Sequence, residues 1–169
     1  VELMVLRITL PETLRPDTLD RFEQSLASVS SPSVIVLEGA CRGMDLESFL
    51  VADAGPYLQR FADVMRGLRM AECPTIAVVD GAVIGGGVGI AAACDVVIAS
   101  PRTSFALPEA LFGLLPGIVI PALRHRMSPH AVHLLALLGT SHSAGWAMSV
   151  GLADEVSDDL ERSTTRWIR

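Results

Sequence analysis

Short apolar runs recur along the chain between more polar segments, and they predict a series of buried strands. The runs are rich in valine, isoleucine and other apolar residues and are bounded by glycine, proline or polar residues, as in strands of a covered sheet. They cover residues 2–10, 33–38, 74–80, 95–100 and 104–106. This pattern predicts sheet structure over most of the chain.

Between these runs, apolar residues recur at every third or fourth position, which is the period of a helix with one buried face. Leu19, Phe22 and Leu26 share such a face after Pro16, and proline is favoured in the first helical turn. Residues 56–70 carry a second stripe, which we interpret as core-facing. Because strands and helices alternate, we predict an α/β protein with a parallel sheet and covering helices.

Three serines mark the beginnings of further helices. Ser128 precedes a proline and is expected to cap a helix that runs to residue 138 and stops at Gly139. Ser143 is expected to cap a short helix, and Ser157 a final helix that reaches residue 168. No repeat or low-complexity linker separates these elements, so residues 1–169 are expected to form a single domain.

Composition and charge restrict the class of protein. Half of the 169 residues are apolar and the formal net charge is −6, which argues against a nucleic-acid partner because phosphate binding needs clustered basic residues. No apolar run is long enough to suggest a membrane partner, so a cytoplasmic protein is expected. The three cysteines lack metal-ligand spacing, and His130 and His133 lack a third ligand, so no metal site is expected.

The segment around Gly85, Gly86, Gly87 and Gly89 is the most informative for chemistry. Glycine lets the backbone approach a ligand closely, and the first N–H groups of a helix have no partner within the helix. Such a segment can hold an oxyanion or a phosphate, or can simply allow close packing. These residues alone do not decide among the three.

The surrounding motifs decide in favour of a family. The chain resembles the crotonase, or enoyl-CoA hydratase/isomerase, superfamily in its glycine helix and in four further segments, at residues 6–10, 38–46, 104–117 and 151–156. The resemblance implies a core of repeated ββα units wound as a superhelix with covering helices. It also implies an acyl-thioester substrate on coenzyme A or on an acyl carrier protein, and a homo-oligomer, as a trimer or hexamer. Family members usually continue with helices used in trimerisation, which are expected to be truncated or absent here.

By this resemblance, three residues carry the chemistry of an enzyme that stabilises a thioester enolate. The backbone N–H groups of Met44 and Gly86 would form the oxyanion hole, and Glu109 would be the acid/base group. The neighbours of Glu109 are apolar, so we expect its pKa to be raised. Asp45 is expected to begin a helix and cap its N–H groups.

The second catalytic glutamate of typical hydratases is replaced by Gly89. An isomerase, a dehydratase and a decarboxylase can each work without the second carboxylate, so the sequence is compatible with all three activities. The resemblance favours a lyase of polyketide β-branching that dehydrates 3-hydroxy-3-methylglutaryl on a carrier protein to 3-methylglutaconyl. It implies no cofactor beyond the phosphopantetheine or coenzyme A that carries the substrate. A hydratase or a non-catalytic oligomer partner is the alternative.

Residues beside these motifs are expected to bind the substrate. They are Arg42, Asp45, Gly85, Gly87 and Phe112. A distal substrate carboxylate needs a positive or hydrogen-bonding partner, for which Arg42, His125 and His142 are the choices. The basic residues at 124–126 could meet an acidic carrier protein or coenzyme A phosphates.

Overall fold

The computed structural model describes residues 3–45 and 54–169, and the strands in these ranges form two sheets. The larger sheet has the order β1-β2-β3-β5-β8, and all its neighbouring strands are parallel. Its strands are β1 (Val5–Thr9), β2 (Val34–Glu38), β3 (Thr75–Val79), β5 (Val96–Ala99) and β8 (Glu155–Val156). The apolar runs therefore predicted the central strands at nearly their observed positions.

The smaller sheet has the order β4-β6-β7. Its strands are β4 (Ala82–Ile84), β6 (Ser104–Ala106) and β7 (His142–Ser143). Along the chain, β3 leads to β4 and then to helix α4 (Gly86–Ala93), while β5 leads to β6 and then to the 3-10 helix η1 (Pro108–Phe112). Since β3 pairs with β5 and β4 with β6, two ββα units stack in succession, as expected for the crotonase fold.

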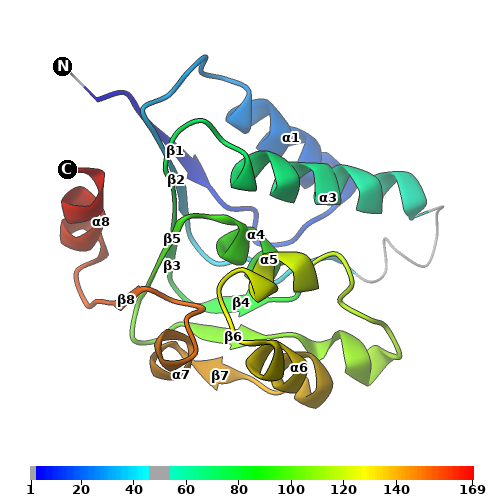
Figure 1. The fold of residues 1–169 in the computed structure, drawn as a ribbon. Coiled ribbons are helices and arrows are strands. Elements are labelled where there is room, and N and C mark those ends of the chain that lie inside the picture. The colour runs from blue at the N-terminus through cyan, green and yellow to red at the C-terminus, as the bar shows by residue number, and fades with distance from the viewer. Residues whose placement is uncertain (1–2, 46–53) are drawn as a thin grey trace.

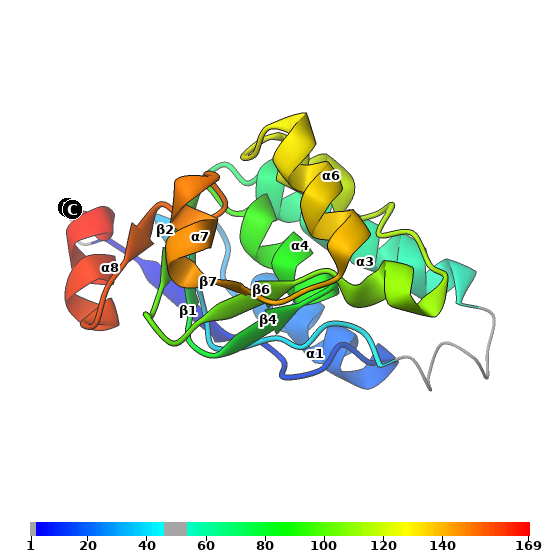
Figure 2. The same ribbon diagram turned by 90° about the horizontal axis from the view of Figure 1, so that it is seen from below.

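Helices cover both faces of the larger sheet. Figure 1 shows α8 (Leu160–Ile168) on one side of this sheet and α1 (Pro16–Leu26), α3 (Gly55–Arg69) and α4 on the other. The smaller sheet lies beside α6 (Pro129–Leu138) and α7 (Ala144–Ser149), as Figure 2 shows, while α5 (Ile120–Arg124) packs on α4. None of the described helices combines the length and the apolar character needed to cross a membrane.

The two faces of the larger sheet divide the core according to the alternation of side chains along a strand. On β2, Ile35 and Leu37 point into the main cluster under α1, α3 and α4. Val34 and Val36 point to the opposite side, where partly buried Leu160 of α8 packs against them. Both faces of the strand are buried, which explains why its sequence is apolar without interruption.

Most helix boundaries agree with the sequence-based predictions. Ser128 Oγ accepts a hydrogen bond from the Ala131 N–H at the beginning of α6, and Gly139 ends that helix with φ of +62°. Ser143 Oγ likewise accepts from the Trp146 N–H at the beginning of α7. In α1, Leu19 and Phe22 are buried as predicted.

The predicted cap of the final helix is wrong. Asp159 is the N-cap of α8, and its carboxylate accepts from the Arg162 N–H at 3.0 Å. Ser157 Oγ instead accepts from the Asp159 N–H and from the Ser163 hydroxyl. Aspartate and serine are both good N-caps, and here the helix begins at Leu160, directly after Asp159, so Ser157 lies two residues before the cap position.

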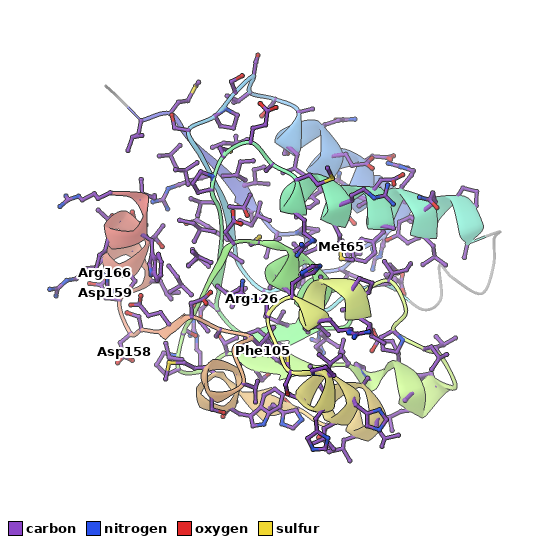
Figure 3. The ribbon with its side chains drawn as sticks, viewed as in Figure 1. Met65, Phe105, Arg126, Asp158, Asp159 and Arg166 are labelled. Atoms are coloured by element: carbon purple, nitrogen blue, oxygen red, sulfur yellow. The ribbon has the colours of Figure 1, made fainter. Side chains whose placement is uncertain are left out.

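Arg126 joins the C-terminal end of α4 to the segment between α7 and β8 (Figure 3). Its guanidinium donates to the carbonyls of Cys94, Asp95 and Leu152 at 2.9, 3.1 and 3.2 Å, and it forms an ion pair with Asp154. A positive charge at this end of a helix also complements the helix dipole. Arg126 is therefore a structural residue of the expected basic cluster and is turned away from solvent, with only 10% of its side chain exposed.

Candidate active site

A cavity of about 400 Å³ opens beside the N-terminal end of α4. Its wall combines the segment after β2, the helix α3, the β4–α4 turn, η1 and the segment before α5. The lining residues are Arg42, Met44, Leu58, Phe61, Ile84, Gly85, Gly86, Pro108, Glu109, Phe112 and residues 114–119. The structure thus brings Met44, Gly86 and Glu109, which lie far apart in sequence, to one cavity.

The backbone of Gly43 lies against the β4–α4 turn. A Cβ on Gly43 would be only 2.6 Å from the Ile84 carbonyl oxygen and 3.0 Å from the Gly86 nitrogen, and Gly43 has φ of +79°. No side chain other than hydrogen fits such an approach without a shift of backbone. The glycine before Met44 therefore sets the separation between the two backbone segments that border the cavity.

The hydrogen bonds around Met44 direct its N–H away from Leu14. Leu14 pairs with this segment, since its N–H donates to the Gly43 carbonyl at 2.8 Å and its carbonyl accepts from the Asp45 N–H at 3.1 Å. Backbone groups alternate in direction along an extended strand, so the intervening Met44 N–H points away from Leu14. Met44 is itself a cavity-lining residue.

Gly86 is the first residue of α4, where an N–H group has no acceptor within the helix. Gly85 precedes it with φ of +54° and ψ of −118°, and the Gly85 N–H is held by the Ala106 carbonyl of β6 at 2.9 Å. The turn between β4 and α4 is thereby fixed to the smaller sheet. Met44, whose N–H is directed away from Leu14, and Gly86, whose N–H has no acceptor within α4, both line the cavity.

Glu109 lies on η1 with its carboxylate beside this turn. Its Oε1 is 2.9 Å from the point that a Cβ on Gly85 would occupy, and its Oε2 is buried without a hydrogen-bond partner among the described residues. Burial raises the pKa of Glu109 above its usual value, as the apolar neighbours predict. Such a carboxyl accepts and returns protons more readily near neutral pH than an exposed glutamate.

The position of the missing second glutamate is closed by apolar side chains. A Cβ on Gly89 would lie 2.8 Å from the sulfur of Met65 and 3.1 Å from Cγ2 of Val119. Met65 reaches this point from α3 (Figure 3). Among the described cavity-lining residues only Arg42 and Glu109 have ionisable side chains, so Glu109 supplies the one carboxyl of this described lining.

Other residues expected to bind the substrate occupy different positions. Arg42, Gly85 and Phe112 line the cavity. Gly87 lies outside the lining and packs on the main chain, because a Cβ there would be 2.1 Å from the Cys41 carbonyl oxygen. Asp45 also lies outside it and forms an ion pair with Arg15, with 3.2 Å between Oδ2 and Nε.

Two further expectations, and the state of one cysteine, concern residues near this region. The helix that Asp45 was expected to cap falls on residues outside the described ranges. His125 and His142 are absent from the cavity lining, and His142 stacks on Trp146 with 4.0 Å between ring centroids. Cys41 is buried, and burial raises the pKa of its thiol to about 11, so it is not a nucleophilic thiolate at neutral pH.

The sequence analysis missed part of the cavity wall. Leu58 and Phe61 belong to the helical stripe that was interpreted as core only, yet both also line the cavity. Leu114 and Leu115 lie in a segment without a periodic pattern and are 44% and 88% exposed. The signal that could have identified them is a pair of leucines between Gly113 and Gly117, outside any helical or strand pattern. Among the described residues no cluster of three or more His, Cys, Asp or Glu side chains could hold a metal ion.

Solved structures place this fold in the crotonase class. The chain superposes on the crystal structure of an enoyl-CoA hydratase from Shewanella pealeana with a TM-score of 0.91, and the match covers 99% of this chain and 70% of that one. The sequence identity is 22%, so this is a likeness of fold alone. The match to the crystal structure of pksH from Bacillus subtilis has a TM-score of 0.85 and a sequence identity of 26%, and it covers 97% of this chain and 72% of that one.

The chain belongs to the enoyl-CoA hydratase/isomerase family, which its sequence matches over residues 3–169. It is 32% identical to bacillaene synthase dehydratase PksH of Bacillus subtilis in an alignment of length 155 that covers 86% of this chain and 59% of that protein. It is 29% identical to enoyl-CoA hydratase ACTT6 of Alternaria alternata in an alignment of length 161 that covers 89% of this chain and 54% of that protein. The chain therefore spans somewhat more than half the length of these curated relatives.

Proposed function

We propose that this protein is a hydro-lyase that removes water from a 3-hydroxyacyl thioester. The observation that carries the proposal is that the carboxyl of Glu109, with its Oε2 buried, is the one carboxyl of the described cavity lining and shares that lining with Met44 and Gly86. The likeness to a relative named as a dehydratase of bacillaene synthase supports this choice within the family. For the substrate we propose 3-hydroxy-3-methylglutaryl carried on an acyl carrier protein, with 3-methylglutaconyl as the product.

In this mechanism the thioester carbonyl oxygen accepts hydrogen bonds from the Met44 and Gly86 N–H groups. Negative charge gathers on that oxygen when the proton on C2 is removed, so donors fixed in advance stabilise the transition state more than the substrate. Both donors belong to the backbone and are positioned by the Gly43 approach and the Gly85 turn. Their position is therefore independent of any side-chain rotamer.

Glu109 acts twice in the proposed reaction. Its carboxylate takes the C2 proton, and the C2–H electron pair moves into the enolate. The enolate then re-forms the carbonyl and makes the C2–C3 double bond while the C3–O bond breaks. The proton on Glu109 passes to the departing hydroxyl, which leaves as water, so that the carboxylate is restored. One carboxyl in a cavity whose second glutamate position is closed supports this sequence.

Arg42 is the proposed partner of the distal carboxylate of the substrate. It is the positive side chain of the cavity lining, and a guanidinium matches a carboxylate in charge and in hydrogen-bond geometry. Elimination of water involves no net oxidation or reduction, so we propose no cofactor beyond the phosphopantetheine arm. We also propose that the protein acts as a homo-oligomer, which light scattering would test.

Mass spectrometry of the carrier-bound acyl group tests the proposed reaction. The protein is incubated with 3-hydroxy-3-methylglutaryl carrier protein, and the loss of one water from the acyl chain is expected. Arg42→Met should raise KM for this substrate by about tenfold or more while leaving a thioester of 3-hydroxybutyrate, which lacks the distal charge, unaffected. Absence of water loss at stoichiometric enzyme would refute the dehydratase function.

An isomerase is the second function that a specific observation favours. Moving a double bond requires only that one carboxyl take a proton from one carbon and return it to another, and Glu109 fits that role. A 3-enoyl thioester would then be converted to the 2-enoyl form without a change of mass. Chromatographic separation of the two isomers distinguishes this activity from dehydration.

A further inference from the structure

The segment from residue 110 to residue 153 differs in charge from the rest of the chain. It contains no aspartate or glutamate, although the whole chain has 19, and it contains all four histidines together with Arg124 and Arg126. The segment includes α5, α6 and α7, which lie on one side of the smaller sheet (Figure 2). An acidic protein thus has one layer without carboxylates.

A groove of about 390 Å³ runs along this layer between η1, α5 and α6. Its floor is apolar, and the charged or titratable side chains in its wall are Arg124 and His133. Leu137 and Leu115 border it and are 59% and 88% exposed. The groove is therefore apolar with a basic edge, a combination suited to an amphipathic acidic surface.

The groove lies next to the candidate active site. Leu115 and Pro116 belong to the walls of both the groove and the active-site cavity. A protein bound in the groove would stand beside the cavity that must receive its thioester. Coenzyme A, which is small, would not need such an apolar surface outside the cavity.

We propose that this groove docks the acyl carrier protein and that Arg124 pairs with a carboxylate of the carrier. The proposal rests on the proposed function for the identity of the partner. Complementary charge is the argument for an acidic carrier, because the groove offers basic and apolar groups and no carboxylate. The exposed leucines supply the apolar contact and Arg124 the orientation.

Two measurements on Arg124→Glu test the proposal. The first is the affinity for holo-carrier protein without an acyl group, measured by fluorescence anisotropy. The second is KM for the same 3-hydroxy-3-methylglutaryl group on the carrier and on free pantetheine. We expect the affinity to fall and KM for the carrier substrate to rise, each by about tenfold, with KM for the pantetheine thioester unchanged. Added salt should weaken the wild-type affinity.

Arg162→Glu is the matched control, since it makes the same charge change on α8, at the other side of the molecule (Figure 1). It should leave carrier affinity at the wild-type value. Equal carrier affinity of wild type and Arg124→Glu would overturn the proposal. So would a fall in oligomer mass of Arg124→Glu with carrier affinity preserved, because the groove would then be a contact between copies of the chain.

The affinity measurement separates this proposal from the proposed function. If the carrier binds, and binds Arg124→Glu more weakly, but neither thioester loses water, then the docking site stands and the dehydratase function fails. If the pantetheine thioester loses water but Arg124→Glu binds the carrier as wild type does, then the function stands and the docking site fails.

Discussion

The buried carboxyl of Glu109 has consequences for both stability and activity. Its Oε2 has no hydrogen-bond partner among the described residues, and its pKa is raised by burial. When folding raises the pKa of a carboxyl, the folded state binds the proton more tightly than the unfolded chain does. The favourable contribution of this binding is complete below the pKa of the unfolded chain and is lost as the pH rises through the folded-state pKa.

We therefore expect Glu109→Gln to separate stability from activity. The amide has the size of the carboxyl but carries no charge, so Tm at pH 8 should equal or exceed that of wild type, and the difference should shrink on acidification. The rate of water loss should fall by about 10²- to 10⁴-fold because the proton acceptor is gone. Calorimetry at two pH values and the mass assay measure the two effects. A variant that keeps the wild-type rate would show that Glu109 is not the base.

The same shift predicts the pH dependence of catalysis. The reaction begins with the carboxylate form of Glu109, so kcat/KM should rise with pH and level off above the raised pKa of this residue. The apparent pKa in the rise should lie above that of an exposed glutamate. Initial rates across buffers of constant ionic strength measure it. A rise centred at or below the usual glutamate value would contradict a desolvated base.

Gly43 is the residue whose replacement should most directly damage the oxyanion hole. Gly43→Ala places a methyl group 2.6 Å from the Ile84 carbonyl oxygen at positive φ, so the backbone must move. We expect a loss of about 1–3 kcal/mol in the free energy of unfolding and a rate loss of about 10²- to 10³-fold. Met44→Ala is the control, since it retains the N–H group. Urea unfolding and the mass assay are the measurements.

The closed position at Gly89 gives a test by paired substitutions. Gly89→Ala adds a methyl group 2.8 Å from the Met65 sulfur and 3.1 Å from Val119, which should cost about 1–3 kcal/mol. Met65→Ala should make part of that cost disappear, because it removes the nearer obstacle. A double-mutant cycle in urea measures the coupling. Strictly additive effects would show that Met65 does not close this position.

At the scale of elements, α4 depends on contacts at both of its ends. Its sequence of glycine, alanine and small apolar residues gives it almost no polar face, and every residue from Gly86 to Ala93 is buried. Its N-terminal end begins at the Gly85 turn, and its C-terminal end is held by Arg126 through the Cys94 and Asp95 carbonyls. The proposed oxyanion donor at Gly86 therefore belongs to a helix fixed by tertiary contacts.

Replacement of Arg126 should weaken this helix and the segment attached to it. Arg126→Met keeps the aliphatic stem but removes the guanidinium donor to the Cys94 and Asp95 carbonyls, and it leaves the Asp154 carboxylate without its ion-pair partner and with the Val97 N–H as its remaining donor. We expect a loss of about 3 kcal/mol in the free energy of unfolding. Arg102→Met, which removes an ion pair with Asp80 on a side chain 78% exposed, is the comparison and should cost less than 1 kcal/mol. Similar losses for both variants would refute the structural role of Arg126.

At the scale of the whole molecule, the apolar runs predicted β1, β2, β3 and β5 of the larger sheet and β6 of the smaller one, and helical periodicity predicted the long helices, but β8 was not predicted. The smaller sheet was harder to predict, because β4 has only three residues before the glycines and β7 only two. Strands this short carry too few positions for a period to be read. Their pairing depends on the stacking of distant units, which is a tertiary property.

In the candidate site too, features carried by one segment could be predicted from the sequence, and features that depend on contacts between segments could not. Motifs placed Met44, Gly86 and Glu109 by resemblance, and the apolar neighbours of Glu109 gave the direction of its pKa. The closure around Gly89 depends on Met65 and Val119, which approach from two other segments. No pattern within one segment predicts such a meeting. The cytoplasmic location and the single-domain organisation stay predictions.

The pairing of β4 with β6 fixes where the chain leaves the smaller sheet toward Gly86 and toward Glu109. Ile84 is level with Ala106 in this parallel pair, and Gly86 and Glu109 follow at two and three residues beyond these partners. The offset between the Gly86 and Glu109 main chains therefore starts from two adjacent strands, which lie about 4.8 Å apart. Side chains in the cavity can be exchanged to accept other acyl groups while this offset stays the same. Inserting one residue between β6 and η1 would misplace the carboxyl against the hole even if every catalytic group were retained.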